Sequence, residues 1–226
     1  MNDRLSIPSK IDFNLVELKS WEEFETFWNK IVTVVDWKIS NREKWILKTF
    51  ESSVYHIDKV KAEIDTLLTV FDIKELDVIF DEINVDNNFW EYCRKNWSQL
   101  RRLYDFEGLE KVDLYRGDQI EKEFNGQKYK FNLWFCWPKV DCLFHNQHDF
   151  IEIHTNIAWK WFMQKALTEK NDWTDEVIET VWLMPGSSHR PFNIEWEKEE
   201  NWNSKYPFHR WLWGATWNIW LVIEKY

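Results

Sequence analysis

The feature that most constrains this chain is its shortage of glycine, because tight turns need residues that tolerate a positive φ. The sequence of 226 residues contains 5 glycines and 18 tryptophans. Ordinary glycine usage of about 7% would give roughly 16 glycines in a chain of this length. Either other residues occupy the turns, or the written sequence differs from the one that the source organism makes.

Tryptophan stands where turn chemistry asks for glycine. Four dipeptides that begin like Asp-Gly or Asn-Gly turns are Asp36-Trp37, Asn96-Trp97, Asp172-Trp173 and Asn201-Trp202. We hypothesise that many tryptophans are encoded by UGA, which some bacterial lineages read as glycine. A tryptophan-rich surface that binds carbohydrate is the alternative, and UGG codons at Trp37, Trp173 and Trp202 would exclude recoding. Trp134 and Trp220 lie in strand-like runs and have the pattern of native tryptophans.

The charge balance excludes two classes of partner. The net charge is -10, with 29 basic and 39 acidic residues, whereas nucleic acid and anionic membranes bind basic surfaces.

The N-terminus has no apolar signal core and no apolar run is long enough for a membrane span, so we expect a cytoplasmic protein. Three cysteines without a CxxC pair favour reduced thiols. The expected partner is a small-molecule ligand, and a homodimer is compatible with the sequence.

The first half of the chain has helical patterns. Ser20 and Glu23 have the spacing of a capping box, which predicts a helix over residues 21–32. The clearest signal covers residues 56–71, where apolar residues recur with a period of 3.6. This apolar stripe consists of Ile57, Val60, Ile64, Leu67, Leu68 and Phe71. The other predicted helices cover residues 42–52, 74–83 and 88–104.

The pattern changes near residue 110, where strand-like runs replace helical stripes. Asn125-Gly126 joins two such runs, residues 113–124 and 128–137, and is a strong hairpin signal. The remaining predicted strands cover residues 150–157, 161–167, 177–183 and 218–225. No linker rich in Gly, Ser or Pro separates the halves, so we expect them to pack together.

Histidines gather in the segment FHNQHDFIEIHTNIAWKWF, residues 144–162. On a strand, His148, Glu152 and His154 would share one face, and His145 could join them only through a bulge or loop. Ionisable groups on the inner face of a small β structure are costly unless they are paired or bind metal. Imidazole and carboxylate are usual ligands of transition metals. The segment therefore predicts a mononuclear metal site, and a hydrogen-bonded core histidine is the alternative.

Two motifs resemble those of the cupin family, which has a small β-barrel. In HNQHDFIEIH, His148 and Glu152 have the spacing of the first motif, and Trp159 stands where the family has glycine. This run also looks like the sensor arms of sugar-responsive transcription factors of the cupin class. In PGSSHRPFN, the second motif is matched by Pro185, Gly186, His189 and Asn193. The histidine pair is HxxH rather than HxH, which puts the role of His145 in question.

The resemblance covers roughly residues 113–226 and implies a cupin-like antiparallel β-barrel (jelly roll) over residues 111–226. With the helical patterns of the first half, the sequence predicts an α+β fold, in which a mostly helical N-terminal region, residues 1–110, precedes this barrel. It implies a divalent transition metal, namely iron, manganese, zinc or nickel. The implied ligands are His145, His148, Glu152 and His189. His154 would then hydrogen-bond to a ligand or replace His145. Arg190 and Arg210 would hold an anionic ligand or form surface ion pairs.

Two classes of function follow from the resemblance. One is a metal-dependent cupin that acts on or binds a small polar molecule inside the barrel, with its reaction unassigned. The other is a non-enzymatic, ligand-sensing cupin whose helical N-terminal part is an interaction module. A stoichiometric metal that is lost in His148→Ala and His189→Ala would favour the first class.

Overall fold

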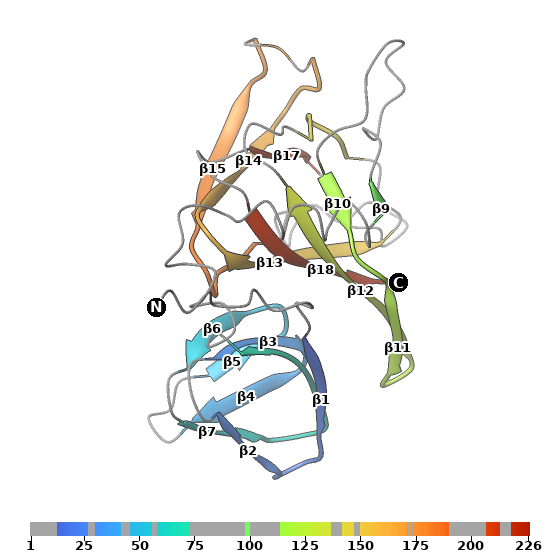
Figure 1. Cartoon of the computed structure of the whole chain (residues 1–226), viewed down its shortest axis with the longest axis vertical. Coiled ribbons are helices and arrows are strands. Elements are labelled where there is room, and N and C mark those ends of the chain that lie inside the picture. The colour runs from blue at the N-terminus through green and yellow to red at the C-terminus, as the bar shows by residue number, and fades with distance from the viewer. Residues whose placement is uncertain are drawn as a thin grey trace, which may run out of the picture. The chain divides into compact units, whose positions relative to one another are not determined.

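The computed structural model describes about three fifths of the chain. The described residues are 13–26, 30–41, 46–55, 58–72, 98–99, 114–136, 142–146, 150–170, 172, 174–189, 207–212 and 218–226. The chain divides into two compact units, Met1–Asn96 with Pro185–Ser188, and Trp97–Met184 with His189–Tyr226. All regular structure in the described ranges is β-strand (Figure 1). Within those ranges no helix has the length and hydropathy needed to span a bilayer.

The described residues of the first unit form eight strands in two antiparallel sheets. They are β1 (Asn14–Leu18), β2 (Glu23–Thr26), β3 (Lys30–Asp36), β4 (Lys38–Asn41), β5 (Ile46–Lys48), β6 (Ser52–Tyr55), β7 (Asp58–Ala62) and β8 (Thr66–Asp72). One sheet has the order β1-β8-β3-β6 and the other has the order β2-β7-β4-β5. The chain thus crosses repeatedly between two sheets, as it does in double-sheet jelly rolls.

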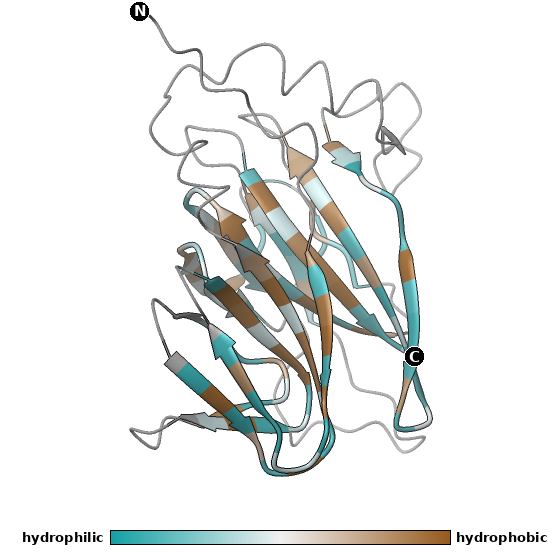
Figure 2. Ribbon diagram, turned by 60° about the horizontal axis from the view of Figure 1, so that its bottom comes forward, coloured by the Kyte–Doolittle hydropathy of each residue, from teal (hydrophilic) through white to brown (hydrophobic). Residues whose placement is uncertain are grey.

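The interior of the first unit is apolar. Its core cluster consists of Leu18, Val32, Val34, Ile39, Val60, Ala62, Leu68 and Val70. Hydrophobic and hydrophilic bands alternate along several strands in Figure 2, which is the period-2 pattern of a half-buried strand. Among its described residues, the buried polar side chains are those of Thr33, Thr66 and Thr69. No described histidine or carboxylate is buried in this unit.

The second unit contains a large and a small antiparallel sheet. Its strands are β9 (Ser98–Gln99), β10 (Leu114–Arg116), β11 (Ile120–Phe124), β12 (Gln127–Cys136), β13 (Ile151–Ala158), β14 (Trp161–Ala166), β15 (Val177–Leu183), β16 (Ser188–His189), β17 (Phe208–Leu212) and β18 (Asn218–Lys225). The large sheet has the order β16-β13-β18-β12-β10-β9, with β11 also paired to β12. The small sheet has the order β15-β14-β17. The described strands form separate sheets, so the predicted closed barrel is wrong.

The strand order of the second unit repeats that of the first. The run β12-β18-β13-β16 corresponds to β1-β8-β3-β6. An isolated bridge between His145 and His209 of β17 extends the small sheet to the order of β2-β7-β4-β5. The register of β13 shifts after Asn156, and that of β3 shifts after Val34. The two shifts precede equivalent turns, and the chain therefore contains one strand order twice.

The predicted helical N-terminal region is wrong for the described residues. Residues 56–71 contain β7 and β8 in place of a helix, and residues 21–32 contain β2 and the start of β3. β8 lies between β1 and β3 and is buried from Thr66 to Phe71. A strand buried on both faces reads as a continuous apolar run, which also satisfies a 3.6-residue stripe. Residues 74–83 and most of residues 88–104 lie outside the described ranges.

Most predicted strands of the second half are confirmed, whereas the predicted strand 113–124 is divided into β10 and β11. Asn125 and Gly126 join β11 to β12 with φ of 50° and 72°, the left-handed values that a two-residue hairpin turn needs. β13, β14, β15 and β18 match the other predicted strands to within one residue at each end. Cys136 and Cys142 are buried and form no disulfide, whereas Cys93 lies outside the described ranges.

Tryptophan occupies left-handed backbone positions, as the recoding hypothesis predicts. Among the described residues, Trp21, Trp37 and Trp159 have φ of 70°, 70° and 63°. Trp37 and Trp159 follow the two register shifts, so they stand at equivalent turns of the two units. A side chain with a Cβ resists this conformation and glycine does not. The backbone therefore supports glycine at these turns in the natural protein, and the codons remain the test.

Candidate metal site

Two candidate ligands come from β13. Glu152 and His154 are two positions apart in the strand and therefore point to the same face of the large sheet. Both are buried, with 5% and 3% of their surface exposed. The ring of His154 lies 6.1 Å from the ring of Trp161 in β14, so this face is directed at the small sheet. Two ionisable groups thus lie inside the second unit, between its sheets.

The small sheet contributes a third group, His209 in β17. His209 is fully buried, and its Nε2 lies 3.8 Å from Oε2 of Glu152. Nε2 of His154 lies 3.4 Å from the same oxygen. One carboxylate oxygen is therefore flanked by imidazole nitrogens from two different sheets.

Both separations are longer than a direct hydrogen bond, and the shorter one matches the spacing of two donors bound to one metal ion. A good N–H···O hydrogen bond spans about 2.7–3.2 Å, which is shorter than both separations. Two donors bound to one ion at about 2.0–2.1 Å with tetrahedral angles lie about 3.4 Å apart. Carboxylate oxygen and imidazole nitrogen are the donor types that divalent transition metals such as zinc, iron, manganese and nickel accept.

Backbone carbonyls fix the orientation of two imidazoles. Nδ1 of His209 lies 3.2 Å from the carbonyl of Pro207, and Nδ1 of His145 lies 2.9 Å from the carbonyl of Leu143. A carbonyl can only accept, so each Nδ1 donates, and the lone pair of the neutral ring falls on Nε2. Histidines that bind metal are commonly oriented in this way. In His209, that lone pair is on the nitrogen nearest to Glu152.

His189 is a further buried imidazole near this group. It is 6% exposed, and neither of its ring nitrogens has a hydrogen-bond partner among the described residues. Burial, followed by the charges of Lys165, His154 and His209, lowers its pKa to about 2. The ring is therefore neutral near pH 7, the form that binds metal. Its short strand, β16, pairs with β13.

His145 lies beside His209. The two histidines exchange backbone hydrogen bonds of 3.1 and 2.9 Å, and their ring centroids lie 4.5 Å apart. His145 is 5% exposed. It therefore extends the buried imidazole group.

A second buried carboxylate lies opposite Glu152. Glu224 of β18 is its cross-strand partner and is 8% exposed. The hydroxyl of Tyr226 donates to Oε2 of Glu224 at 2.8 Å, and the amide of Asn132 lies 3.5 Å from Oε1. Burial raises the pKa of Glu224, and the charge of Glu152 raises it further. Glu224 thus lies on the same face of the large sheet as Glu152 and has partners of its own in Tyr226 and Asn132.

The other predicted site residues are placed differently. Arg210 follows His209 in β17 and therefore points to the opposite face of the small sheet. Its guanidinium donates to Oε1 of Gln164 at 3.1 and 2.9 Å and lies 4.3 Å from the ring of Phe144. His148 and Arg190 lie outside the described residues.

Sequence reasoning missed His209 as a site residue. It lies in the strand Phe208–Leu212, where His209 and Trp211 are buried and their neighbours are half-buried. That alternation signals an inward-facing histidine, but nothing in the sequence places it beside Glu152, which lies 57 positions earlier. The described part of the chain holds no ready-made group of three or more His, Cys, Asp or Glu side chains at ligating distances. Metal binding would therefore have to draw these side chains closer together.

Comparison with known proteins gives only distant similarity. Neither a protein-family model nor a curated protein matches the sequence. A cupin 2 conserved barrel domain protein from Leptotrichia buccalis has 10% identity and a TM-score of 0.34, over 94% of this chain and 82% of that chain. An oxalate decarboxylase from Bacillus subtilis, with Mn(II) centres, has 11% identity and a TM-score of 0.35, over 96% and 70%. A structure of DMSP lyases has 11% identity and a TM-score of 0.33, over 50% and 47%.

The two sequence motifs resemble those of the cupin family, and a cupin protein is also among the similar structures. TM-scores this low do not carry a fold or a function from those proteins to this chain. The chemistry of the site has to come from its own residues.

Proposed function

We propose that the second unit binds one divalent transition metal ion between β13 and β17. The ligands would be Glu152, His154 and His209, with His189 available as a fourth. The main support for this proposal is that Oε2 of the buried Glu152 lies 3.4 Å from Nε2 of His154 and 3.8 Å from Nε2 of His209. Imidazole and carboxylate are the donors that iron, manganese, zinc and nickel accept in proteins.

The energetic cost of this arrangement supports a functional role. Burying ionisable groups without full pairing is unfavourable, and Nδ1 of His154 has no hydrogen-bond partner among the described residues. Val32 lies two residues before the start of the register shift of β3, and His154 lies two residues before that of β13. The two residues therefore occupy equivalent positions in the two units. The same strand order is therefore built with an apolar residue at this position. The fold alone does not require the histidine.

A bound ion would supply a Lewis acid with coordination positions left open for a small polar molecule. Glu152 would offset part of its charge, and the neutral imidazoles would add none. The carbonyls that hold Nδ1 of His209 and of His145 would keep these rings oriented. The function proposed is thus a metal-binding protein that takes a small polar ligand at the metal. A helical interaction module finds no support in the described residues of the first unit, which are strands and turns.

Titration with Co²⁺ tests the metal site. The purified chain should take up one Co²⁺ and develop visible absorption bands, because imidazole and carboxylate ligands replace water. Glu152→Gln and His209→Ala should each abolish the bands. Glu224→Gln is the matched control, since it removes the neighbouring buried carboxylate and should retain the bands. Uptake that is equal in all four proteins would overturn the proposal, as would no uptake by the unchanged chain.

A further inference from the structure

The turn directly before His189 belongs to the first unit. The chain leaves the second unit after Met184, contributes Pro185–Ser188 to the first unit, and returns to the second unit at His189. Gly186 in this turn is buried and has φ of 82°, a left-handed value that glycine adopts without the clash of a Cβ. His189 is therefore covalently attached to a segment that packs as part of the first unit.

Two serine hydroxyls hold this turn against the turn between β5 and β6. Oγ of Ser52 donates to the carbonyl of Gly186 at 2.8 Å, and Oγ of Ser188 donates to the carbonyl of Phe50 at 2.9 Å. Each turn thus gives one hydroxyl to the other and accepts one in return, and we name this reciprocal pair of hydrogen bonds the serine clasp. Since β5 and β6 correspond to β15 and β16 in the repeated strand order, the clasp joins two equivalent turns.

The turn between β5 and β6 is itself fixed to β3, an inner strand of its sheet. The amide of Phe50 donates to the carbonyl of Val34 at 2.7 Å, and the amide of Val34 donates to the carbonyl of Glu51 at 2.9 Å. Phe50 is buried with φ of 67°, a conformation that persists only where the surrounding structure holds it. The serine clasp therefore ties the turn before His189 to backbone that is hydrogen-bonded to the interior of a sheet.

The ring of His189 has no such support of its own. Neither of its nitrogens has a hydrogen-bond partner among the described residues, whereas Nδ1 of His209 is oriented by the carbonyl of Pro207. Successive side chains of a strand point to opposite faces, so Ser188 reaches into the clasp while His189 points away from it. We infer that Ser52 and Ser188 are positioning residues, which set the direction of the buried His189 ring through the backbone. This inference does not rest on the proposed metal site.

NMR of the chain labelled with ¹³C-histidine, recorded in the presence of a chelator, tests the inference. The Cε1–Hε1 signal of His189 is assigned by its absence in His189→Gln. It should move in Ser52→Ala and move further when Ser188→Ala is added, because the turn loses first one and then both hydroxyl bonds. The signal of His209 should stay in place, because the carbonyl of Pro207 still holds that ring.

Two further variants separate positioning from a general loss of stability. Ser52→Thr keeps a hydroxyl and should keep the His189 signal of the unchanged chain. Ser20→Ala is the matched control, since it removes a hydroxyl bonded at 2.9 Å to the carbonyl of Glu63 elsewhere in the first unit, and it should leave the signal unchanged. An unmoved His189 signal in folded Ser52→Ala would overturn the inference, as would an equal movement in Ser20→Ala. If the double variant fails to fold, Ser52→Ala alone decides the test.

Discussion

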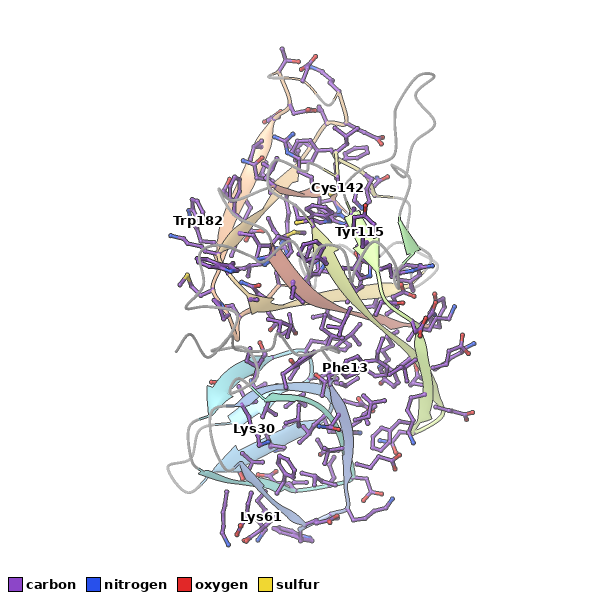
Figure 3. All side chains as sticks on the ribbon, in the orientation of Figure 1. Phe13, Lys30, Lys61, Tyr115, Cys142 and Trp182 are labelled. Carbon is purple, nitrogen blue, oxygen red and sulfur yellow. The ribbon has the colours of Figure 1, made fainter. Side chains whose placement is uncertain are left out.

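The two units share a strand order and differ in what that order encloses. The first unit encloses Val32, Val34 and other apolar side chains, and its described buried polar residues are threonines. The second unit encloses a cluster of tryptophans at one end of the interior and Glu152 with histidines at the other. In the first unit, the position of Glu152 is taken by Lys30, which Figure 3 labels on β3.

This difference separates what the fold needs from what the site needs. The aromatic end of the second unit follows the ordinary rule that apolar side chains fill a protein interior. The ring centroid of Trp220 lies 4.8 Å from that of Trp211 and 5.3 Å from that of Trp161. The histidine end departs from this rule, since Nδ1 of His154 and both ring nitrogens of His189 are buried without a hydrogen-bond partner among the described residues. A segment that departs from the local pattern without a structural gain is where function is expected.

The largest expected effect comes from moving the histidine into the first unit. Val32→His should lower the free energy of unfolding of that unit by about 2–3 kcal/mol, because Val32 is fully buried in an apolar cluster. Urea unfolding monitored by far-UV circular dichroism measures the loss. A loss below about 0.5 kcal/mol, the usual range for surface changes, would mean that this interior also accepts a histidine.

The reverse change should stabilise the metal-free chain. His154→Val should raise the free energy of unfolding of the second unit by about 1 kcal/mol, because it removes a buried nitrogen without a partner among the described residues. It should also remove Co²⁺ uptake. Urea unfolding in a chelator and Co²⁺ titration measure the two effects. If the metal-free variant is instead destabilised, His154 has a structural role.

The smallest expected effect concerns the two equivalent turns. Trp37→Gly and Trp159→Gly should each stabilise the chain by about 1 kcal/mol, because glycine adopts φ of 70° and 63° without the clash of a Cβ. Thermal unfolding of each variant measures the gain. Trp182→Gly is the control, since Trp182 is exposed in a strand (Figure 3) and glycine should weaken that strand. Destabilisation by both turn substitutions would show that these tryptophans suit their turns.

The sequence predicted the strands and the hairpin of the second unit because period-2 patterns and Asn125-Gly126 are local signals. It also predicted that Glu152 and His154 share a face. It mispredicted the first unit because β8, buried on both faces, has no alternation to distinguish it from a helix. The pairing of His209 with Glu152 depends on two sheets meeting, which no local pattern encodes. The repeated strand order was hidden for a similar reason, since equivalent positions such as Val32 and His154 differ in chemistry.

Stabilisation by metal tests the central claim most directly. The free energy of unfolding of the unchanged chain should rise by about 2.7 kcal/mol when free Zn²⁺ is at about 100 times its dissociation constant. His154→Val should show no rise at the same Zn²⁺ concentration. An unchanged chain that is indifferent to Zn²⁺, Mn²⁺, Ni²⁺ and Fe²⁺, or a variant that gains as much as the unchanged chain, would contradict a metal site at Glu152, His154 and His209.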